Sequence, residues 1–393
     1  MILKNCTFFN ENFEKEYGDI EIENGKIKQI GILDGDGKDM TGKIIIPGFI
    51  DVHTHGAYGF DNNVYTFKYC RMSPMDPIGA CGHPSELTQQ KMAKELAKHG
   101  VTSFCPTSMT LPKERLESIV ETIKEFKEEN HGGAKVMGIN LEGPFIAMSK
   151  KGAQNADYVR GGTIEEFDDL YAKSGKLVKL ITIAPEAFDS EKFINHAKDY
   201  VNVSIGHSSA NADECKKAID CGISHATHLF NAMTPMAHRE AGIAGTVLDD
   251  ERVMCELICD GGHICPTVLR NAFKILGENR AVVISDSMRG AGLGEGEFEL
   301  GGQAVFVKPG GKYAVLEDGT IAASISNIHT EFKNLISFGI DFKTALKSCT
   351  INPAKSINED KNIGSIAVGK CADLVALNEN LDIEEVYING ILA

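Results

Sequence analysis

The stretch Ile44-Ile45-Ile46-Pro47-Gly48-Phe49-Ile50-Asp51-Val52-His53-Thr54-His55 is an apolar run that ends in two histidines. Such a run predicts a buried β-strand. Residues two positions apart on a strand point to the same side, so His53 and His55 present two imidazoles in one direction. Two imidazoles form half of a metal site of the kind that binds zinc. The pair alone proves little, so its meaning depends on the rest of the chain.

Seven further apolar runs follow, and most of them end in a polar residue. With the first, the predicted strands cover 44–55, 101–108, 136–142, 177–185, 201–207, 225–230, 253–260 and 281–286. Helical stretches separate them, for instance 86–99 and 113–129, where apolar residues recur every three or four positions. Eight parallel strands that alternate with helices predict an α/β fold, a (β/α)8 TIM-like barrel. The chemistry of such a barrel lies at the carboxyl ends of its strands.

Both ends of the chain predict small β segments. Residues 20–30 alternate between apolar and polar side chains around Asn24-Gly25, a hairpin signal. Residues 369–377 and 383–390 have the same character. Since neither end can bury a core alone, we expect them to pair into one small β-sandwich domain. Residues 1–48 and 355–393 would form it, and residues 49–354 would form the catalytic barrel.

The composition predicts a globular, cytoplasmic protein. The formal net charge of −15 argues against nucleic acid as a partner, because a phosphate backbone requires a basic surface. No apolar run reaches the length of a membrane span, and no secretory signal is visible, so we expect no membrane association. The 11 cysteines have no regular spacing, which predicts reduced core residues.

Three later strands carry a metal-competent residue at or near the end. Glu142 ends the third, His207 ends the fifth, and His228 lies in the sixth. Only a closed barrel would bring these three together. A hydrolytic metal site uses histidine and carboxylate ligands and leaves a position for water. We therefore expect these three residues to bind a divalent metal ion.

The remaining parts of a hydrolytic site are also present. His53 and His55 could complete a second metal position beside the first. Asp286 ends the eighth strand, where it is the natural general base and later the acid that protonates a leaving amine.

Other histidines fit ordinary structural roles. His225 lies three residues before His228, a spacing that points it to the opposite face of a strand. We expect no metal-binding role for it, nor for His99, His131, His196 and His329. The long loop 62–85 contains Cys70, Cys81 and His83, and a separate metal site there is a weaker alternative to a plain surface loop.

Several motifs together resemble the N-acetylglucosamine-6-phosphate deacetylases of the amidohydrolase superfamily. They are His53-Thr54-His55-Gly56, Leu141-Glu142-Gly143-Pro144-Phe145, Gly206-His207-Ser208, His228-Leu229-Phe230-Asn231-Ala232-Met233, His238-Arg239-Glu240 and Ser285-Asp286-Ser287-Met288-Arg289. The resemblance runs through essentially the whole chain. It implies a homodimeric enzyme that removes the acetyl group from an amino-sugar phosphate. One or two divalent ions are implied, with zinc first and iron, manganese or cobalt as alternatives.

The resemblance also implies which residues contact the sugar phosphate. These are Ala153, Gln154, Asn231, Ala232, Arg239, His263, Ile321, Ala322 and Ala323. Arg239 would supply the cation that an acidic protein needs for a phosphate group. His263 would orient the substrate and polarise the acetamide carbonyl as a second catalytic residue beside Asp286.

One departure from the family pattern concerns specificity. Gln154 stands where the family usually has histidine, and glutamine cannot carry a charge. N-acetylgalactosamine-6-phosphate therefore stays an alternative substrate. A cyclic amidohydrolase or deaminase would share the barrel and the metal site but would not need the phosphate-binding residues. A catalytically silent barrel should have lost a ligand or the base, and this sequence keeps them all.

Overall fold

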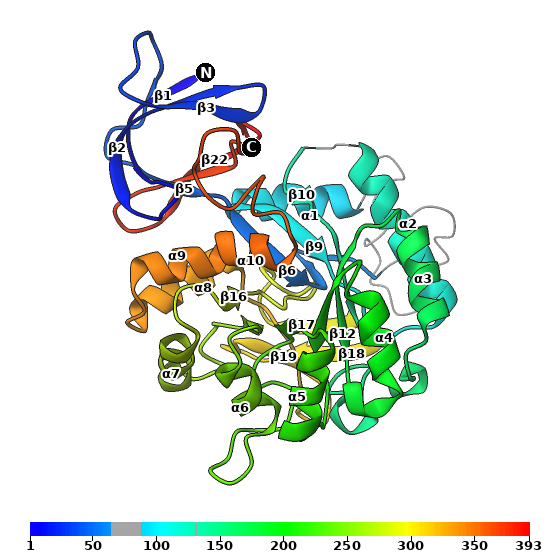
Figure 1. Ribbon diagram of the computed structural model, residues 1–393. Helices are drawn as coiled ribbons and strands as arrows, with labels where there is room; N and C mark the ends of the chain where they lie inside the picture. The colour runs from blue at the N-terminus through cyan, green and yellow to red at the C-terminus, as the bar shows by residue number, and fades with distance from the viewer. Residues whose placement is uncertain (64–87, 130–131) are drawn as a thin grey trace.

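A barrel of parallel strands surrounded by helices forms the centre of the protein (Figure 1). The computed structural model describes residues 1–63, 88–129 and 132–393. The barrel strands in chain order are β6 (Phe49–Thr54), β9 (Val101–Pro106), β11 (Ile139–Glu142), β12 (Val178–Ile183), β13 (Asn202–Ile205), β14 (His225–Ala226), β15 (Met254–Leu257) and β16 (Ala281–Val283).

The pairing of these strands closes a ring. Strand β6 pairs with β9, and β11 to β16 pair with one another in chain order, all in parallel. Parallel bridges from Thr107 to Asn140 and from Thr54 to Ser287 join the two sets. The predicted (β/α)8 barrel is therefore confirmed. Each strand is shorter than predicted, so the predicted metal ligands and base lie at or just beyond the strand ends.

Two predicted strands are divided in the structure. Residues 44–55 form β5 (Ile44–Pro47), which belongs to another sheet, and β6 in the barrel. Between them, a Cβ atom at Gly48 would lie only 2.1 Å from Oγ1 of Thr102, so this junction requires glycine. Likewise, residues 136–142 form β10 (Lys135–Val136), which pairs with β9, and β11, which pairs with β12.

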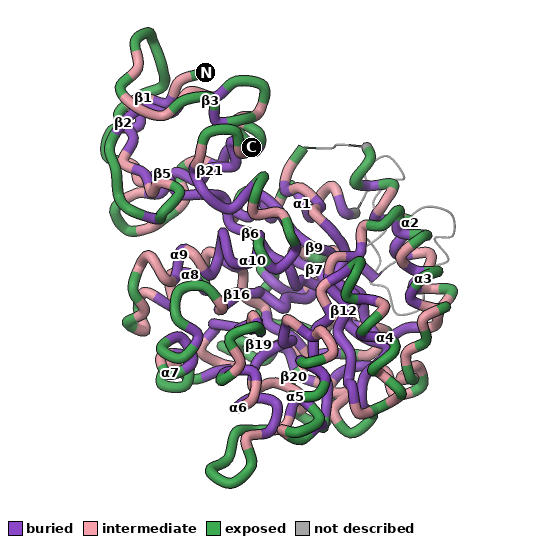
Figure 2. Tube along the Cα trace, viewed as in Figure 1, coloured by how far each residue is buried: buried purple, intermediate pink, exposed green. Residues whose placement is uncertain are grey.

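Helices cover the outside of the barrel, as Figure 1 shows. They are α1 (Thr88–Lys98), α2 (Lys113–Glu129), α3 (Ile164–Lys173), α4 (Ser190–Ala197), α5 (Ala212–Cys221), α6 (Gly242–Asp249), α7 (Pro266–Leu276), α8 (Ile328–Ser337), α9 (Phe342–Cys349) and α10 (Ile351–Ser356). Helix α2 has the predicted bounds. Asn211 begins α5 with a capping box, in which Asn211 and Glu214 satisfy each other's backbone N–H groups. Buried residues concentrate along the barrel strands (Figure 2).

Strands from both ends of the chain share one sheet. They are β1 (Ile2–Phe9), β2 (Lys15–Glu23), β3 (Lys26–Gly31), β4 (Lys38–Asp39), β5, β21 (Leu374–Leu377), β22 (Ile383–Ile388) and β23 (Ile391–Leu392). Strand β5 joins the two ends, because it pairs with β1 and with β21. The sheet curves round a core of its own that includes Leu3, Phe8 and Tyr387 (Figure 1).

An antiparallel sheet between β16 and α8 was not predicted. It consists of β17 (Gly296–Leu300), β18 (Gln303–Val307), β19 (Tyr313–Val315) and β20 (Ile321–Ser324). A bridge from Ser287 to Ser324 attaches β20 to the end of the barrel. Gly301-Gly302 between two alternating segments is a hairpin signal that could have revealed the first pair.

Some sequence predictions concern residues outside the described ranges. Cys70, Cys81 and His83, and with them the alternative metal site, lie there, as does His131. The cysteines that the structure describes are all free thiols. Across the described ranges, no helix combines the length and the apolar character that crossing a membrane requires.

Candidate metal and substrate site

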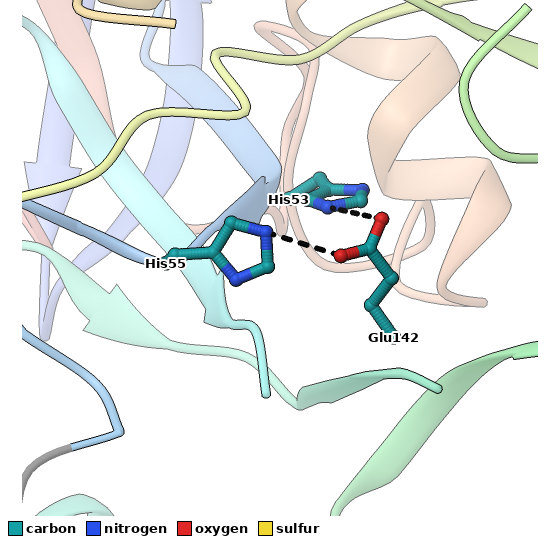
Figure 3. Close-up of side chains that lie close together, drawn as sticks. All are labelled: His53, His55 and Glu142. Carbon is teal, nitrogen blue, oxygen red and sulfur yellow. Dashed lines mark ion pairs between the residues drawn. The ribbon is translucent and has the colours of Figure 1, made fainter. Parts of the chain in front are cut away.

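The carboxyl ends of the barrel strands bring the predicted metal ligands and the predicted base into one buried cluster. His53 and His55 point toward Glu142 from β6 and the residue after it (Figure 3). The cluster is completed by His207, His228 and Asp286, and all of these residues are buried. Ligand atoms within three groups lie no more than 4.8 Å apart: His53, His55 and Glu142; His53, His228 and Asp286; and Glu142, His207 and His228.

Glu142 is the centre of this cluster. Its Oε1 lies 3.1 Å from Nε2 of His207 and 3.2 Å from Nε2 of His228. The distance from Oε1 to Nε2 of His53 is 3.5 Å, and Oε2 lies 3.3 Å from Nε2 of His55. One carboxylate therefore faces imidazoles from both predicted metal positions, which is the arrangement expected of a bridging ligand.

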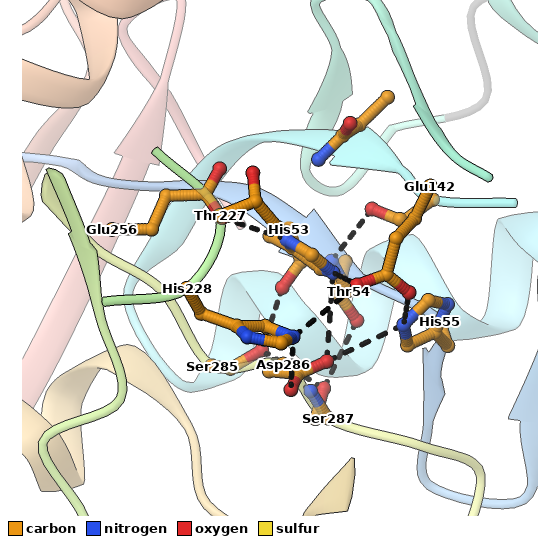
Figure 4. Close-up of polar contacts among 12 residues, drawn as sticks. His53, Thr54, His55, Glu142, Thr227, His228, Glu256, Ser285, Asp286 and Ser287 are labelled. Atoms are coloured by element: carbon orange, nitrogen blue, oxygen red, sulfur yellow. Dashed lines mark hydrogen bonds and ion pairs between the residues drawn. The ribbon is translucent and has the colours of Figure 1, made fainter. Parts of the chain in front are cut away.

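Asp286 faces the same imidazoles from the end of β16. Its Oδ1 lies 3.3 Å from Nε2 of His55 and 3.5 Å from that of His53, and its Oδ2 lies 3.6 Å from Nε2 of His228 (Figure 4). Its backbone N–H donates to the carbonyl of His53 at 2.9 Å. Contacts of both its backbone and its side chain thus hold the predicted base, Asp286, beside the imidazoles.

The electrostatics of the cluster favour positive charge. Burial alone would lower the pKa of His55, but Asp286 and Glu142 raise that pKa to about 10. Glu142 and Asp286 likewise outweigh burial and raise the pKa of His228 to about 9. Burial would raise the pKa of Glu142, but His53 and His207 hold that pKa well below its usual range. A cluster that attracts protons this strongly will also attract a divalent cation.

The donor set fits a divalent metal. Among the described residues, Nε2 of His53, which faces Glu142 and Asp286, is buried without a hydrogen-bond partner. Buried polar atoms of this kind normally have partners, so exceptions need an explanation. Imidazole nitrogens and carboxylate oxygens within one small volume are the ligands that zinc and related ions use. The described residues therefore fit the metal that the sequence predicts.

Three residues of this site have a strained backbone. The φ angles of His207, Ala232 and Asp286 are 47°, 50° and 45°, a left-handed conformation that few residues other than glycine adopt. Before His207, a Cβ atom at Gly206 would lie 2.2 Å from the carbonyl oxygen of Thr227. Such strain persists only where surrounding contacts impose it, and it is frequent at functional sites.

Sequence reasoning missed the residues that orient the imidazoles. Nδ1 of His207 lies 2.8 Å from the carbonyl oxygen of Lys150, and Nδ1 of His53 lies 2.9 Å from Oε2 of Glu256. Glu256 is an isolated acid within an apolar strand, and this unusual position could have identified it in the sequence. His225 was predicted to be structural, and it lies buried outside the three ligand groups.

A cavity of about 400 Å³ opens above the cluster. A volume of this size suits a small-molecule ligand. Most of the predicted substrate residues line it, namely Ala153, Gln154, Asn231, Ala232, His263, Ile321 and Ala322. Nδ1 of His263 lies 2.7 Å from Oδ2 of Asp260, which leaves Nε2 for other contacts. Thr320, Met109 and Ser149 also line the cavity and were not predicted.

Two predicted substrate residues do not line this cavity in the single chain. Ala323 is buried within β20, and Arg239 lies on an exposed loop, where its Nη1 is 2.6 Å from Nε2 of His238. Among the described lining residues, Lys150 is the only lysine or arginine. Its Nζ donates to the carbonyl of Met233, beside Asn231 and Ala232. A cation that the sequence analysis did not consider is therefore part of the cavity wall.

Comparison with known proteins agrees with this geometry. The model of the amidohydrolase family matches residues 44–392. The chain belongs to the amidohydrolase family. This amidohydrolase is 32% identical to N-acetylglucosamine-6-phosphate deacetylase of Bacillus subtilis (strain 168), across 100% of the chain and 97% of that relative.

Two further comparisons refine the relationship. The amidohydrolase is 30% identical to N-acetylgalactosamine-6-phosphate deacetylase of Escherichia coli O157:H7, across 95% of the chain and 94% of that relative. It superimposes on the crystal structure of N-acetylglucosamine-6-phosphate deacetylase from Pasteurella multocida with a TM-score of 0.87 and 27% identity, covering 100% of this chain and 99% of that one. The relationship therefore includes the barrel and the small sheet together.

Proposed function

We propose that this protein is a metal-dependent deacetylase that converts N-acetylglucosamine-6-phosphate and water into glucosamine-6-phosphate and acetate. The observation that carries the proposal is the position of the Glu142 and Asp286 cluster in the wall of a cavity that also contains Asn231, Ala232 and Lys150. The cluster suits amide hydrolysis, and the polar and cationic residues suit a sugar phosphate. Relatives with this activity resemble the chain over its whole length.

Asp286 carries the proton transfers in this proposal. Residues Glu142, His207 and His228 would hold one divalent ion, and His53 and His55 would hold a second. A bound ion supplies Lewis acidity toward the water and the acetyl carbonyl. Asp286 then accepts a proton from the attacking water and returns it to the nitrogen of the sugar, so that the amide bond breaks and an amine leaves.

His263 would position the acetamide group. Asp260 accepts the hydrogen bond from Nδ1 of His263 and fixes the ring, so that Nε2 is the atom available to the substrate. In the protonated ring, Nε2–H donates to the acetyl oxygen as charge develops there. Ile321 and Ala322 on β20 form an apolar wall of the same cavity, which helps to exclude water from the reacting atoms.

Three further features belong to the proposal. Zinc is the first choice of metal, because imidazole and carboxylate ligands suit it, with iron, manganese and cobalt as alternatives. The free thiols of the described cysteines support a reducing, cytoplasmic location. We place the protein in a homodimer, where Arg239 on its exposed loop would be available to a neighbouring subunit and to the phosphate.

The galacto epimer is a second candidate substrate, because of Gln154. This residue lines the cavity, and its side chain is fixed by Thr110 and Glu142. The relative from Escherichia coli O157:H7 that is named for the galacto sugar resembles the chain almost as well as those named for the gluco sugar. The preference between the two epimers is therefore to be established by assaying both sugars under the same conditions.

The test is acetate release by the metal-loaded protein. N-acetylglucosamine-6-phosphate, its galacto epimer and unphosphorylated N-acetylglucosamine are compared side by side. Fast release from the phosphorylated gluco sugar alone is the expected result. Faster release from the epimer would establish the second candidate. No release from either phosphorylated sugar would refute both, and cyclic amides would then be the next substrates to assay.

A further inference from the structure

A carboxylate that the proposed reaction does not use lies directly behind the metal-ligand cluster. Glu256 is on β15, fully buried, with its Oε2 at 2.9 Å from Nδ1 of His53. Figure 4 shows the ring of His53 between Glu256 and Glu142. Burying a carboxylate is costly unless it is paired, and His53 provides the pairing. Because burying Glu256 is energetically unfavourable, its position suggests that it has a role toward the ring of His53.

The two nitrogens of His53 face different partners. Nδ1 faces Glu256, whereas Nε2 lies 3.5 Å from both Oε1 of Glu142 and Oδ1 of Asp286. An ionised carboxylate only accepts hydrogen bonds, so Glu256 favours the tautomer with its proton on Nδ1. The lone pair is then on Nε2, inside the cluster. In the opposite tautomer an N–H group would point at the metal position and prevent coordination.

His225 is a second imidazole near Glu256, but it is not hydrogen-bonded to it. Nδ1 of His225 lies 3.7 Å from Oε1 of Glu256 and closer, at 3.3 Å, to Oγ of Ser204. Within the part of the chain that the structure describes, neither Oε1 of Glu256 nor Nδ1 of His55 has a hydrogen-bond partner. Among the described residues, His53 is therefore the one member of the pair His53 and His55 whose Nδ1, the nitrogen turned away from Glu142 and Asp286, has an acceptor, and that acceptor is Glu256.

We infer that Glu256 is a positioning residue: it orients His53 for coordination and thereby sets how tightly the position formed by His53, His55 and Glu142 binds its divalent ion. A histidine that binds a metal through one nitrogen often donates a hydrogen bond from its other nitrogen to a carboxylate. Removing that carboxylate typically lowers metal affinity by roughly ten- to a hundredfold. This inference concerns the metal position that the proposed function uses. Its test measures bound metal, so its outcome is independent of which sugar is cleaved.

The test compares two substitutions at Glu256. Glu256→Met keeps the length of the side chain and removes the acceptor, whereas Glu256→Gln keeps an acceptor oxygen without the charge. Zinc content per chain and competition with a chelator report the affinity of each ion. We expect Met to weaken the binding of one ion by roughly ten- to a hundredfold while the other stays bound. Gln should cause a smaller but measurable loss, because a neutral acceptor forms a weaker hydrogen bond than a carboxylate.

A matched control separates positioning from burial. Glu331 is also fully buried, and it accepts a hydrogen bond from the backbone of Cys259 rather than from an imidazole. Glu331→Met should therefore leave both ions in place. Equal metal loss in the Glu331 and Glu256 variants would overturn the inference, as would wild-type affinity in Glu256→Met or binding of only one ion by the wild-type chain.

A second experiment covers the case in which Glu256→Met does not fold. In a His53→Ala background Glu256 has no ring to orient, so adding Glu256→Gln should change metal affinity no further. Contacting residues of this kind show non-additive effects in a double-mutant cycle. If Glu256→Gln reduced metal affinity as much in the His53→Ala background as in the wild-type chain, Glu256 would not act through His53.

Discussion

The amide nitrogen of Gln154 donates a hydrogen bond to Oε2 of Glu142 at 2.6 Å. The amide oxygen of Gln154 accepts from the backbone N–H of Thr110 at 2.7 Å, so both ends of the side chain are fixed. Gln154 is buried, and it lies against the carboxylate that faces most of the imidazoles. Gln154 therefore holds Glu142 in place, beside the substrate contact proposed for it.

Replacing Gln154 by leucine should expose this role. Gln154→Leu leaves the buried N–H of Thr110 and one oxygen of Glu142 without their partner. We expect a loss of about 1–3 kcal/mol in the free energy of unfolding, measured by urea denaturation, together with weaker metal binding. Gln154→His offers both a donor and an acceptor and should retain stability and activity. A leucine variant as stable as the wild type would contradict the assignment.

Removing the proposed base should stop the reaction and leave the metal. Asp286→Asn keeps the size of the side chain but cannot accept the proton of the attacking water. We expect kcat to fall by about 10²–10⁴-fold, with the zinc content unchanged by elemental analysis. As a control, Asp250→Asn alters a carboxylate that pairs with Arg252 away from the cavity, and it should retain activity. Substantial turnover by Asp286→Asn would exclude the residue from proton transfer.

The barrel could be predicted from sequence because its signals are local and repeated. Most of the apolar runs end in a polar residue, and the helical stretches between them show a periodicity of their own. The ends of the strands could not be predicted, because pairing between neighbours decides them. Residues 225–230 illustrate this, since only His225 and Ala226 keep ladder partners. The sheet from β17 to β20 was missed because its strands are short and lie beyond the eight strands that complete the barrel pattern.

The clustering of these histidines and acids could also be predicted, because such residues are unusual at strand ends, and the carboxyl ends of the strands meet at one end of a parallel barrel. Their supporting contacts could not. Glu256 is four residues from Asp260 in sequence, yet one contacts His53 and the other His263. Lys150 acts on His207 through its backbone carbonyl, which no side-chain motif reveals. Contacts of this kind depend on the three-dimensional course of the chain.

Lys150 should contribute to phosphate recognition, because it is the cation in the described cavity wall. A charged hydrogen bond to phosphate is worth about 1.5–3 kcal/mol, so Lys150→Met should raise KM for the phosphorylated sugar roughly ten- to a hundredfold. KM for the unphosphorylated sugar should change little. Lys151→Met is the matched control, since Lys151 is adjacent but does not line the cavity. Equal effects on both sugars would argue against a phosphate contact.

Arg239 offers a second test of phosphate binding. Its loop is exposed in the single chain, so Arg239→Ala should leave folding unchanged. If the homodimer brings Arg239 to a phosphate group, this substitution should raise KM for the phosphorylated sugar more than for the unphosphorylated one. An unchanged KM, with the oligomeric state confirmed by light scattering, would leave recognition to Lys150, Asn231 and Ala232.

The metal-free protein should lose stability at high pH. The carboxylates of Glu142 and Asp286 raise the pKa of His55 to about 10 and that of His228 to about 9, against an ordinary value of about 6.5. A pKa raised by folding stabilises the folded state fully below the unfolded value, and the stabilisation is lost as pH rises through the folded value. Urea midpoints of the metal-free protein should therefore fall between pH 7.5 and 10.

The metal-loaded protein provides the control for this pH dependence. Coordination requires neutral imidazoles, so at pH 7.5 metal binding must displace protons from His55 and His228. Zinc titration by calorimetry in buffers of different ionisation enthalpy should show proton release, and less of it at pH 10. With the imidazoles already neutral, the loaded protein should lose less stability than the metal-free protein over the same pH range. Parallel losses, or binding without proton release, would show that the carboxylates do not hold these rings protonated.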